Sequence, residues 1–408
     1  PHAPAVDGKI STDEWSGAVA LTGFTILNDC VLSERQAVVY LGYTDSHVYA
    51  AFSCPLTGQV KKQDMARDTM GGNETHGVEL WLVPPDQGYY QYLTCPGPGK
   101  MDTRSTEGKA WNGKWKIQDG VVDIPEEIGG ILSFRKKLWT TELAIPFATL
   151  GVTDPEAGVW RLNVTRNWAA PAGQKRASND WTTWSQLVGR FAQPDAFAFA
   201  TFAPAPAIQF EHLGDLANGE LRITGNCRPL TGSVRLTAKA VLPQSGKTLS
   251  LTSVEIAAGA PAEFDLNSIL QTNETQVLDY HLLAEDVGTG NLLYKQTIPF
   301  LAAAALRLRA VPVLYRDELV VEIDTSRVPD LPDSFTLTSR LLRGDQPASP
   351  PQAHPWTRVG APDDIRHSLA NLVPGEYGVK VTVAVPGAGK PLTGAVARFI
   401  IPEPQPWY

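Results

Sequence analysis

Short runs of β-branched and aromatic residues, each closed by Gly, Pro or Asp, recur along the chain and constrain its fold more than any other feature. Before residue 204 these runs cover 38–45, 47–54, 77–84, 89–96, 138–147 and 160–168. Such runs are typical of β-strands. No window longer than about ten residues keeps the 3.6-residue period of an amphipathic helix, although 147–151 indicates one helical turn. The sequence therefore predicts an all-β protein.

The chain of 408 residues is long enough for several domains, and its amino-acid composition changes near residue 204. Most tryptophans precede this point, and the alternating Ala-Pro segment Phe202–Ala207 favours an extended connector. Two stretches of evenly spaced strand-like runs follow, each about the size of an immunoglobulin-like sandwich. In the later stretch, Tyr377 occupies the place of a corner tyrosine that bonds the backbone. We predict three β-domains: a large sandwich at 1–203, an immunoglobulin-like sandwich at 208–300, and a second immunoglobulin-like or fibronectin-III-like sandwich at 305–408.

Charge and hydropathy limit the partners. The formal net charge of -8 and the pI of about 5.5 argue against a nucleic acid, which needs a basic patch on its partner. No apolar run is long enough to span a bilayer. The first residues, Pro-His-Ala-Pro, resemble a mature or trimmed N-terminus, so the lack of a signal peptide does not argue for the cytosol. We expect a secreted, periplasmic or cell-surface protein.

The four cysteines are too few and too scattered for a disulfide framework, and no CxxC pair is present for zinc. Cys54 and Cys95 each close a strand-like run. A single bridge between them and two buried free thiols both fit this pattern.

Five sequence blocks in order carry a resemblance to a known family. The blocks are Val6–Trp15, Ala37–Phe52, His76–Leu82, Trp139–Phe147 and Gly158–Arg166. Their order and spacing over residues 6 to about 202 resemble a family 9 carbohydrate-binding module. The resemblance implies a jelly-roll-like β-sandwich that binds sugar without catalysis. Trp15, Trp139 and Trp160, which belong to these blocks, are predicted to lie in the core.

The resemblance also implies a sugar site. Members of the family clamp a terminal sugar between two tryptophans, with a glutamate, an arginine and amides at the rim. The strand glutamate corresponds to Glu79. The other positions differ here: the clamp tryptophans correspond to Asn73 and Phe191, the rim arginine to Leu93, and the amide to Thr165, with Asn167 two positions on. The domain therefore either binds a different glycan or has lost sugar binding.

Other residues can supply what a sugar needs, which is an aromatic face for its C–H groups and a few polar partners for its hydroxyls. Trp111 and Trp181 are the candidate aromatic platforms, with Trp184 expected to point inward. Trp111 fits equally a position packed over the sandwich rim. Arg104 and Arg166 can donate two hydrogen bonds to hydroxyls or to a uronate, or can form surface ion pairs.

The sequence also bears on three other kinds of site: a catalytic site, a haem site and a calcium site. No carboxylate pair stands out by motif, and no nucleophile elbow, P-loop or HExxH is present, so we predict that the chain is not an enzyme. Related β-sandwiches bind haem through Met and His or Lys. The corresponding candidates here are Met65, Met70, Met101, His47 and His76, but Met70 and His76 share one loop instead of facing each other. No cofactor is expected, although carboxylates in turns could hold structural calcium; these are Asp7, Asp13, Glu14 and Asp45.

The sequence thus predicts glycan binding by a secreted multi-domain β-protein, ancillary to polysaccharide degradation and paired with a catalytic domain or partner enzyme. The alternative is a scaffold whose first domain has lost sugar binding and mediates protein–protein contacts. The candidate carbohydrate-binding residues are Asn73, Glu79, Arg104, Trp111, Arg166, Asn167, Trp181 and Phe191.

Overall fold

The structure, a computed structural model, consists almost entirely of strands. It describes residues 3–57, 67–68, 75–97, 99–128, 131–170, 174–259, 261–270, 272, 275–328, 331–344, 346–357, 364–385 and 391–403, without the side chains of 124–128 and 131–136. The helices in these ranges are short: α1 (Thr12–Trp15), η1 (Phe147–Leu150), η2 (Ser178–Asp180), η3 (Pro194–Ala196), η4 (Leu216–Asn218) and η5 (Leu314–Arg316). No helix in the described part could cross a bilayer. The predicted all-β fold is confirmed.

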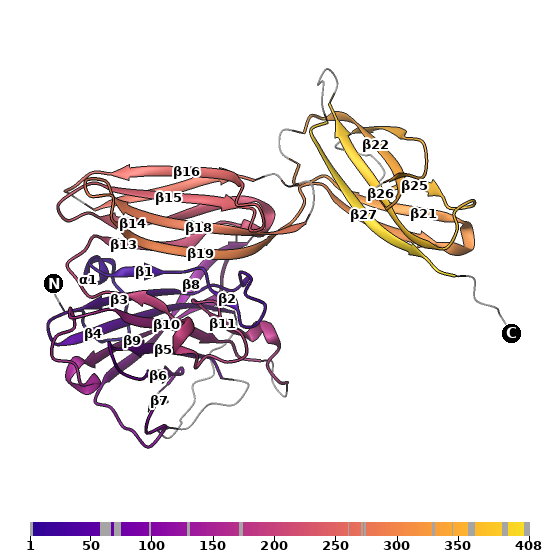
Figure 1. Ribbon diagram of the computed structural model, residues 1–408. Helices are drawn as coiled ribbons and strands as arrows, with labels where there is room; N and C mark the ends of the chain where they lie inside the picture. Colours follow the sequence, from indigo (N-terminus) through magenta and orange to yellow (C-terminus); the bar gives the residue numbers. More distant parts are fainter. Residues whose placement is uncertain are drawn as a thin grey trace. The chain divides into compact units, whose positions relative to one another are not determined.

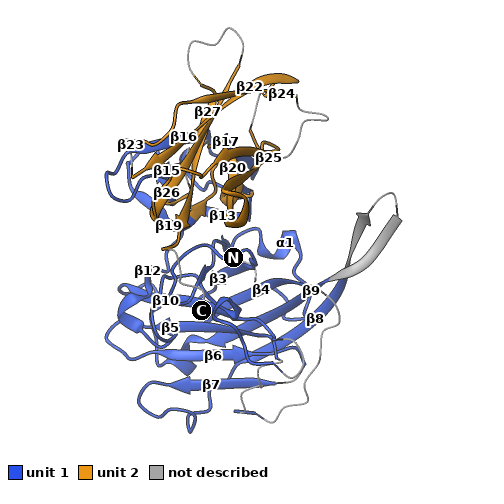
Figure 2. Cartoon of the chain, turned by 90° about the vertical axis from the view of Figure 1, so that its right-hand side faces the viewer, with its two compact units in different colours: residues 1–214, 221–268, 279–300 blue, residues 215–220, 269–278, 301–408 orange. Residues whose placement is uncertain are grey.

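The chain divides into two compact units, which Figure 2 shows in different colours. The first unit combines residues 1–214, 221–268 and 279–300. The second combines 215–220, 269–278 and 301–408. The division into three domains at 1–203, 208–300 and 305–408 stays a prediction.

Three sheets build the first unit (Figure 1). The eight-stranded sheet has the order β17 (Ala262–Ile269), β14 (Glu220–Arg228), β13 (Ala207–Leu213), β1 (Val19–Leu21), β3 (Val38–Tyr43), β4 (His47–Thr57), β9 (Ile131–Pro146) and β8 (Lys116–Ile128). The seven-stranded sheet has the order β2 (Thr25–Ile26), β11 (Trp181–Thr183), β10 (Trp160–Asn167), β5 (Gly77–Val83), β6 (Tyr90–Thr94) and β7 (Lys100–Arg104), with β12 (Ala198–Ala200) on β10. The four-stranded sheet has the order β16 (Thr248–Ile256), β15 (Val234–Val241), β18 (Gln276–Asp286) and β19 (Leu292–Ala302).

The core of the first sandwich lies between the eight- and seven-stranded sheets, because strands of both contribute alternate residues to it. Trp139 on β9 and Trp160 on β10 are fully enclosed there, at 0% and 1% exposure. Trp15 is also buried, so the three tryptophans predicted as core are confirmed. Cys54 is a free thiol inside this core, so it forms no bridge with Cys95.

Glu142, a buried carboxylate on β9, fixes the N-terminal segment. Its Oε2 accepts hydrogen bonds from the backbone N–H groups of Asp7 at 3.0 Å and Gly8 at 2.8 Å. Its Oε1 accepts one from the Trp15 indole at 3.0 Å. Gly8 has a φ of 84°, and a Cβ there would lie 2.6 Å from the Asp119 carbonyl oxygen, so glycine is required. Glu142 therefore joins the first sequence block to the fourth.

The first sandwich also bonds directly to the strands that follow it in the same unit. Residue Ala20 of β1 pairs in parallel with Gln209 of β13. The Gln209 amide donates to the carbonyl oxygens of Trp15 at 2.7 Å and Ala18 at 3.2 Å. The Gln296 amide of β19 donates to the Thr22 carbonyl oxygen at 2.8 Å. These buried amides fix the edge of the first sandwich, because each satisfies backbone acceptors that water cannot reach.

The second unit is a smaller sandwich of two sheets. One sheet has the order β20 (Arg307–Val313), β21 (Glu318–Asp324) and β25 (Asp364–Ser368), and the other β23 (Gln346–Pro347), β22 (Ser334–Arg343), β26 (Gly375–Ala384) and β27 (Thr393–Ile401), with β24 (Gln352–Thr357) on β22. The hydroxyl of Tyr377 donates to the Val373 carbonyl oxygen at 2.9 Å. Tyr377 therefore bonds the backbone as predicted for a corner tyrosine.

Candidate functional site

Strand β5 is buried on both faces. Its side chains alternate between the core and the opposite side of the sheet, where the candidate site residues lie. Val78, Leu80 and Leu82 face the core between the two sheets. Glu79 and Trp81 lie on the opposite side of the seven-stranded sheet, because successive side chains of a strand point to opposite faces. We call this side the outer face.

A row of polar side chains crosses the outer face at Glu79. The Asn167 amide of β10 donates to Glu79 Oε1 at 2.7 Å, and the Gln91 amide of β6 donates to Glu79 Oε2 at 2.8 Å. The Thr103 hydroxyl of β7 donates in turn to Gln91 Oε1 at 2.9 Å. We call these four residues the Glu79 row. They meet because Asn167 and Gln91 lie diagonally across from Glu79 in the registers of β10 and β6.

The Glu79 carboxyl is enclosed, at 3% exposure, and the amides of Asn167 and Gln91 that donate to it are neutral. Burial therefore raises the pKa of Glu79 above its usual value, against the opposing effect of the hydrogen bonds that it accepts. Asn167 is equally buried, and its Oδ1 has no hydrogen-bond partner among the described residues. A buried acceptor without a donor is costly. The row thus contains a buried acceptor that no described residue uses.

Trp181 supplies an aromatic ring beside this row. It pairs in register with Asn167, so both side chains lie on the outer face of neighbouring strands. Its ring is half-buried, with the Arg176 guanidinium 4.9 Å from its centroid. Its other ring neighbour is Phe191, at 5.8 Å between centroids, which packs with Trp81 in an apolar cluster. Trp181, Asn167 and Glu79 thus stand on three adjacent strands.

The side chain of Arg166 points to the opposite face of the sheet from that of Asn167 and lies in the core. Its guanidinium lies 5.1 Å from the Trp139 ring centroid and 4.5 Å from that of Trp168. It donates to the carbonyl oxygens of Gly77 at 2.9 Å and Asn167 at 3.0 Å. No carboxylate pairs with it within the described residues. Burial lowers the pKa of Arg166 from its usual value, and its role here is to support the strand ends from inside.

His76, just before β5, is held in its neutral form. Its Nδ1 accepts from the Ala169 backbone N–H at 3.1 Å and lies 3.2 Å from Arg166 Nη2. Both of those nitrogens are donors, so Nδ1 carries no proton. Burial, followed by the charges of Arg166, Arg176 and Arg35, lowers the pKa of His76 to about 3.

Acid is expected to destabilise the first unit through His76. The pKa is about 6.5 when the chain is unfolded and about 3 when it is folded, so the unfolded chain binds more protons between these values. The stability contributed by neutral His76 is complete above pH 6.5 and is lost as pH falls toward 3. The loss between pH 6.5 and 5 should be about 2 kcal/mol.

Urea titrations at pH 7 and pH 5 measure this effect as a change in the free energy of unfolding. His76→Gln keeps an acceptor for both donors and removes the titrating ring, so it should reduce the difference between the two pH values. The exposed His212, changed to Gln, is the matched control and should leave the difference unchanged. An unaltered pH dependence in His76→Gln would contradict the assignment.

The remaining predicted residues lie elsewhere. Arg104 pairs with Glu107 at 2.8 Å and lies 5.5 Å from the Tyr90 ring centroid. Trp111 also packs on Tyr90, at 5.2 Å between centroids, and is half-buried. Tyr90 belongs to the core between the sheets, so the structure does not bring Arg104 and Trp111 to the Glu79 row. Asn73 lies outside the described residues.

The sequence did not indicate as sugar contacts two members of the Glu79 row, Gln91 and Thr103, or two residues beside it, His76 and Arg176. The sequence contained an indication that Gln91 belongs to the site, because it is the polar residue within the aromatic run from Tyr89 to Tyr92. By strand alternation it shares a face with Leu93, the position matched to the family's rim arginine. Arg176 lies in no strand-like run of the sequence, so its approach to Trp181 had no signal there.

The carboxylates predicted as calcium ligands at Asp7 and Glu14 accept hydrogen bonds from residues of their own turns. Asp7 Oδ1 accepts from the Lys9 backbone N–H at 2.8 Å, and Glu14 accepts from the Ser11 hydroxyl at 2.9 Å. Within the described ranges, no three His, Cys, Asp or Glu side chains gather as metal ligands. Of the methionines named for haem, Met65 and Met70 lie outside the described residues, and Met101 packs in an apolar cluster.

Comparisons with known proteins gave no family. No family model and no curated protein matches the sequence. A candidate carbohydrate-binding protein from Bacteroides uniformis aligns over 50% of this chain and 94% of its own, at 13% identity and a TM-score of 0.34. The FN1–FN3 domains of chicken CNTN1 align over 79% and 97%, at 13% identity and a TM-score of 0.18. A β-glucuronidase from Bacteroides uniformis aligns over 64% and 27%, at 10% identity and a TM-score of 0.20. Likenesses this weak carry no argument about function.

Proposed function

We propose that this chain is a non-catalytic glycan-binding protein of the family 9 type, and that the Glu79 row contacts the sugar. The protein acts outside the cytoplasm, on a polysaccharide, beside a catalytic domain or partner enzyme. The five sequence blocks support the family, since two of them are joined physically by Glu142.

The observation that carries the proposal is the buried acceptor set on the outer face. Glu79 and Asn167 present carboxylate and amide oxygens next to the half-buried ring of Trp181. Sugars require this combination, because their hydroxyls donate to fixed acceptors while their C–H faces stack on an aromatic ring. A scaffold domain needs neither a desolvated carboxyl that accepts from side-chain amides nor a buried amide oxygen that no described residue donates to.

Glu79→Gln is expected to weaken glycan binding at least about tenfold, because one of the two acceptor oxygens of the carboxyl is replaced by a donor. Affinity electrophoresis of the full chain in gels containing neutral and acidic polysaccharides measures the effect. The matched control is Glu142→Gln, the same change at a buried carboxylate of the other sheet, which should keep the retardation. Circular dichroism confirms that both variants fold.

Two results would overturn the proposal. One is that no polysaccharide retards the unmodified chain, which favours a scaffold that mediates protein–protein contacts. The other is that Glu79→Gln binds as tightly as the unmodified chain, which would place the sugar elsewhere. Release of reducing sugar during incubation would contradict the non-catalytic assignment.

A further inference from the structure

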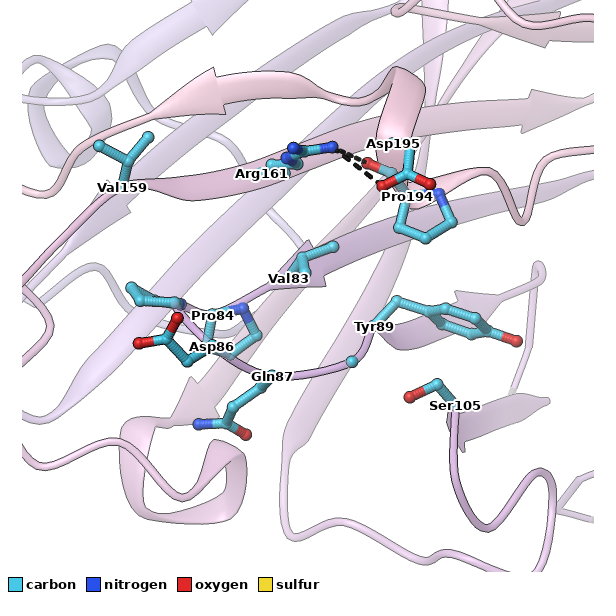
Figure 3. Close-up of a pocket in the computed structure, with 12 residues that line it drawn as sticks. Val83, Pro84, Asp86, Gln87, Tyr89, Ser105, Val159, Arg161, Pro194 and Asp195 are labelled. Carbon is cyan, nitrogen blue, oxygen red and sulfur yellow. Dashed lines mark hydrogen bonds and ion pairs between the residues drawn. The ribbon is translucent and has the colours of Figure 1, made fainter.

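A pocket of about 450 Å³ opens at the end of the seven-stranded sheet where β5 leads into β6 (Figure 3). One wall carries Arg161 of β10 and Asp195 of η3. The turn opposite carries Asp86 and Gln87, and the ring of Tyr89 lies beyond this turn. None of these residues belongs to the Glu79 row.

An exposed ion pair lies on one wall of this pocket. Arg161 Nη1 lies 3.3 Å from Asp195 Oδ1 and donates to the Pro194 carbonyl oxygen at 3.3 Å. The same guanidinium lies 5.0 Å from the ring centroid of Phe199, a side chain that is 73% exposed. With Asp86 on the opposite turn, the lining has more acid than base, which disfavours an anionic ligand.

The walls are held in place by close contacts. A Cβ on Gly88 would lie 1.9 Å from the Ser105 hydroxyl, and one on Gly158 would lie 2.9 Å from Pro85. The Tyr90 hydroxyl donates to Gln87 Oε1 at 3.0 Å. Because the turns pack this tightly, the pocket is formed before any ligand arrives, which lowers the cost of ordering on binding.

The pocket is separate from the Glu79 row. Val83, which lines it, lies four residues beyond Glu79 on β5, or about 13 Å along the strand. Between them the outer face is covered by the apolar cluster of Trp81, Phe191 and Phe197. A ligand in the pocket therefore contacts residues other than those of the Glu79 row.

We propose that this pocket is a second saccharide subsite, specific for a neutral sugar; the inference rests on the proposed glycan-binding function. Apolar surfaces from Tyr89 and the prolines suit the C–H faces of a sugar ring. Arg161 and Asp195 provide a donor and an acceptor on the same wall, 3.3 Å apart, which suits neighbouring hydroxyls. A glycan that engages the row and the pocket together gains avidity, because the second contact becomes intramolecular.

The test uses the full chain with Arg161→Gln and, separately, Asp195→Ala. Both side chains are accessible, so the variants should fold. The probes are neutral polysaccharides, namely xylan, β-glucan, mannan and galactan, with polygalacturonate as the acidic comparison. Each pocket variant should weaken binding of at least one neutral polysaccharide about tenfold. Arg309→Gln, which breaks an exposed ion pair with Glu322 in the second unit, is the matched control and should bind normally.

The outcomes separate the two proposals. Loss in Arg161→Gln with full binding in Glu79→Gln supports the pocket and contradicts the row. Full binding of every polysaccharide by both pocket variants overturns the pocket, and loss in Glu79→Gln then leaves the proposed function standing. Failure of the unmodified chain to bind any neutral polysaccharide also overturns the pocket.

Discussion

Glu142→Ala is expected to lower the free energy of unfolding of the first unit by about 3 to 5 kcal/mol. The carboxylate is completely buried and accepts hydrogen bonds from Asp7, Gly8 and Trp15. Alanine leaves the buried donors of Gly8 and Trp15 without a partner, and each unsatisfied buried group costs about 1 to 3 kcal/mol. Urea unfolding followed by tryptophan fluorescence measures the loss.

The control for this variant is Glu14→Ala in the same segment. Glu14 is exposed and, among the described residues, accepts from the Ser11 hydroxyl alone, so its removal should change the free energy of unfolding by less than about 0.5 kcal/mol. Equal stability of Glu142→Ala and the unmodified chain would show that the N-terminal segment is not tied to β9.

Arg166→Ala is expected to lower the free energy of unfolding by about 3 kcal/mol or more. The change empties the space between Trp139 and Trp168 and leaves the carbonyl oxygens of Gly77 and Asn167 without a donor. It also removes two desolvated cation–π contacts, worth about 2 kcal/mol each.

Arg166→Met is the matched comparison, because it fills the space without the charge. Replacing a buried charge by an apolar group of similar volume often costs little. We therefore expect Arg166→Met to be more stable than Arg166→Ala in the same urea titration. A loss below about 0.5 kcal/mol in Arg166→Ala would contradict the enclosed placement of the guanidinium.

The strands could be predicted because their residues alternate or cluster in patterns that only strands satisfy. The runs 77–84 and 160–168 correspond to β5 and β10, and the turn at 147–151 corresponds to η1. The core tryptophans followed from size and hydrophobicity. The bonds of Glu142 to Asp7, Gly8 and Trp15 did not, because they join residues more than a hundred positions apart.

The candidate site was only partly predictable, and Arg166 and Asn167 show why. Both were named as sugar contacts, yet adjacent residues in a strand point to opposite faces, so only one can lie on the outer face. The register of β10 with β5 decides which, and it places Asn167 beside Glu79. Trp111 fits both an exposed platform and a packed rim, and the sequence pattern alone cannot choose between them because both need an aromatic ring near Gly and Lys.

The most direct test of glycan binding at the Glu79 row is NMR titration of the side-chain amide groups of Asn167 and Gln91. Addition of a saccharide taken from a retarding polysaccharide should shift both pairs of N–H signals in a saturable way, because both amides bond Glu79. The exposed amide of Asn112 should not move. If the saccharide binds while the Asn167 and Gln91 signals stay in place, the sugar does not bind at the Glu79 row.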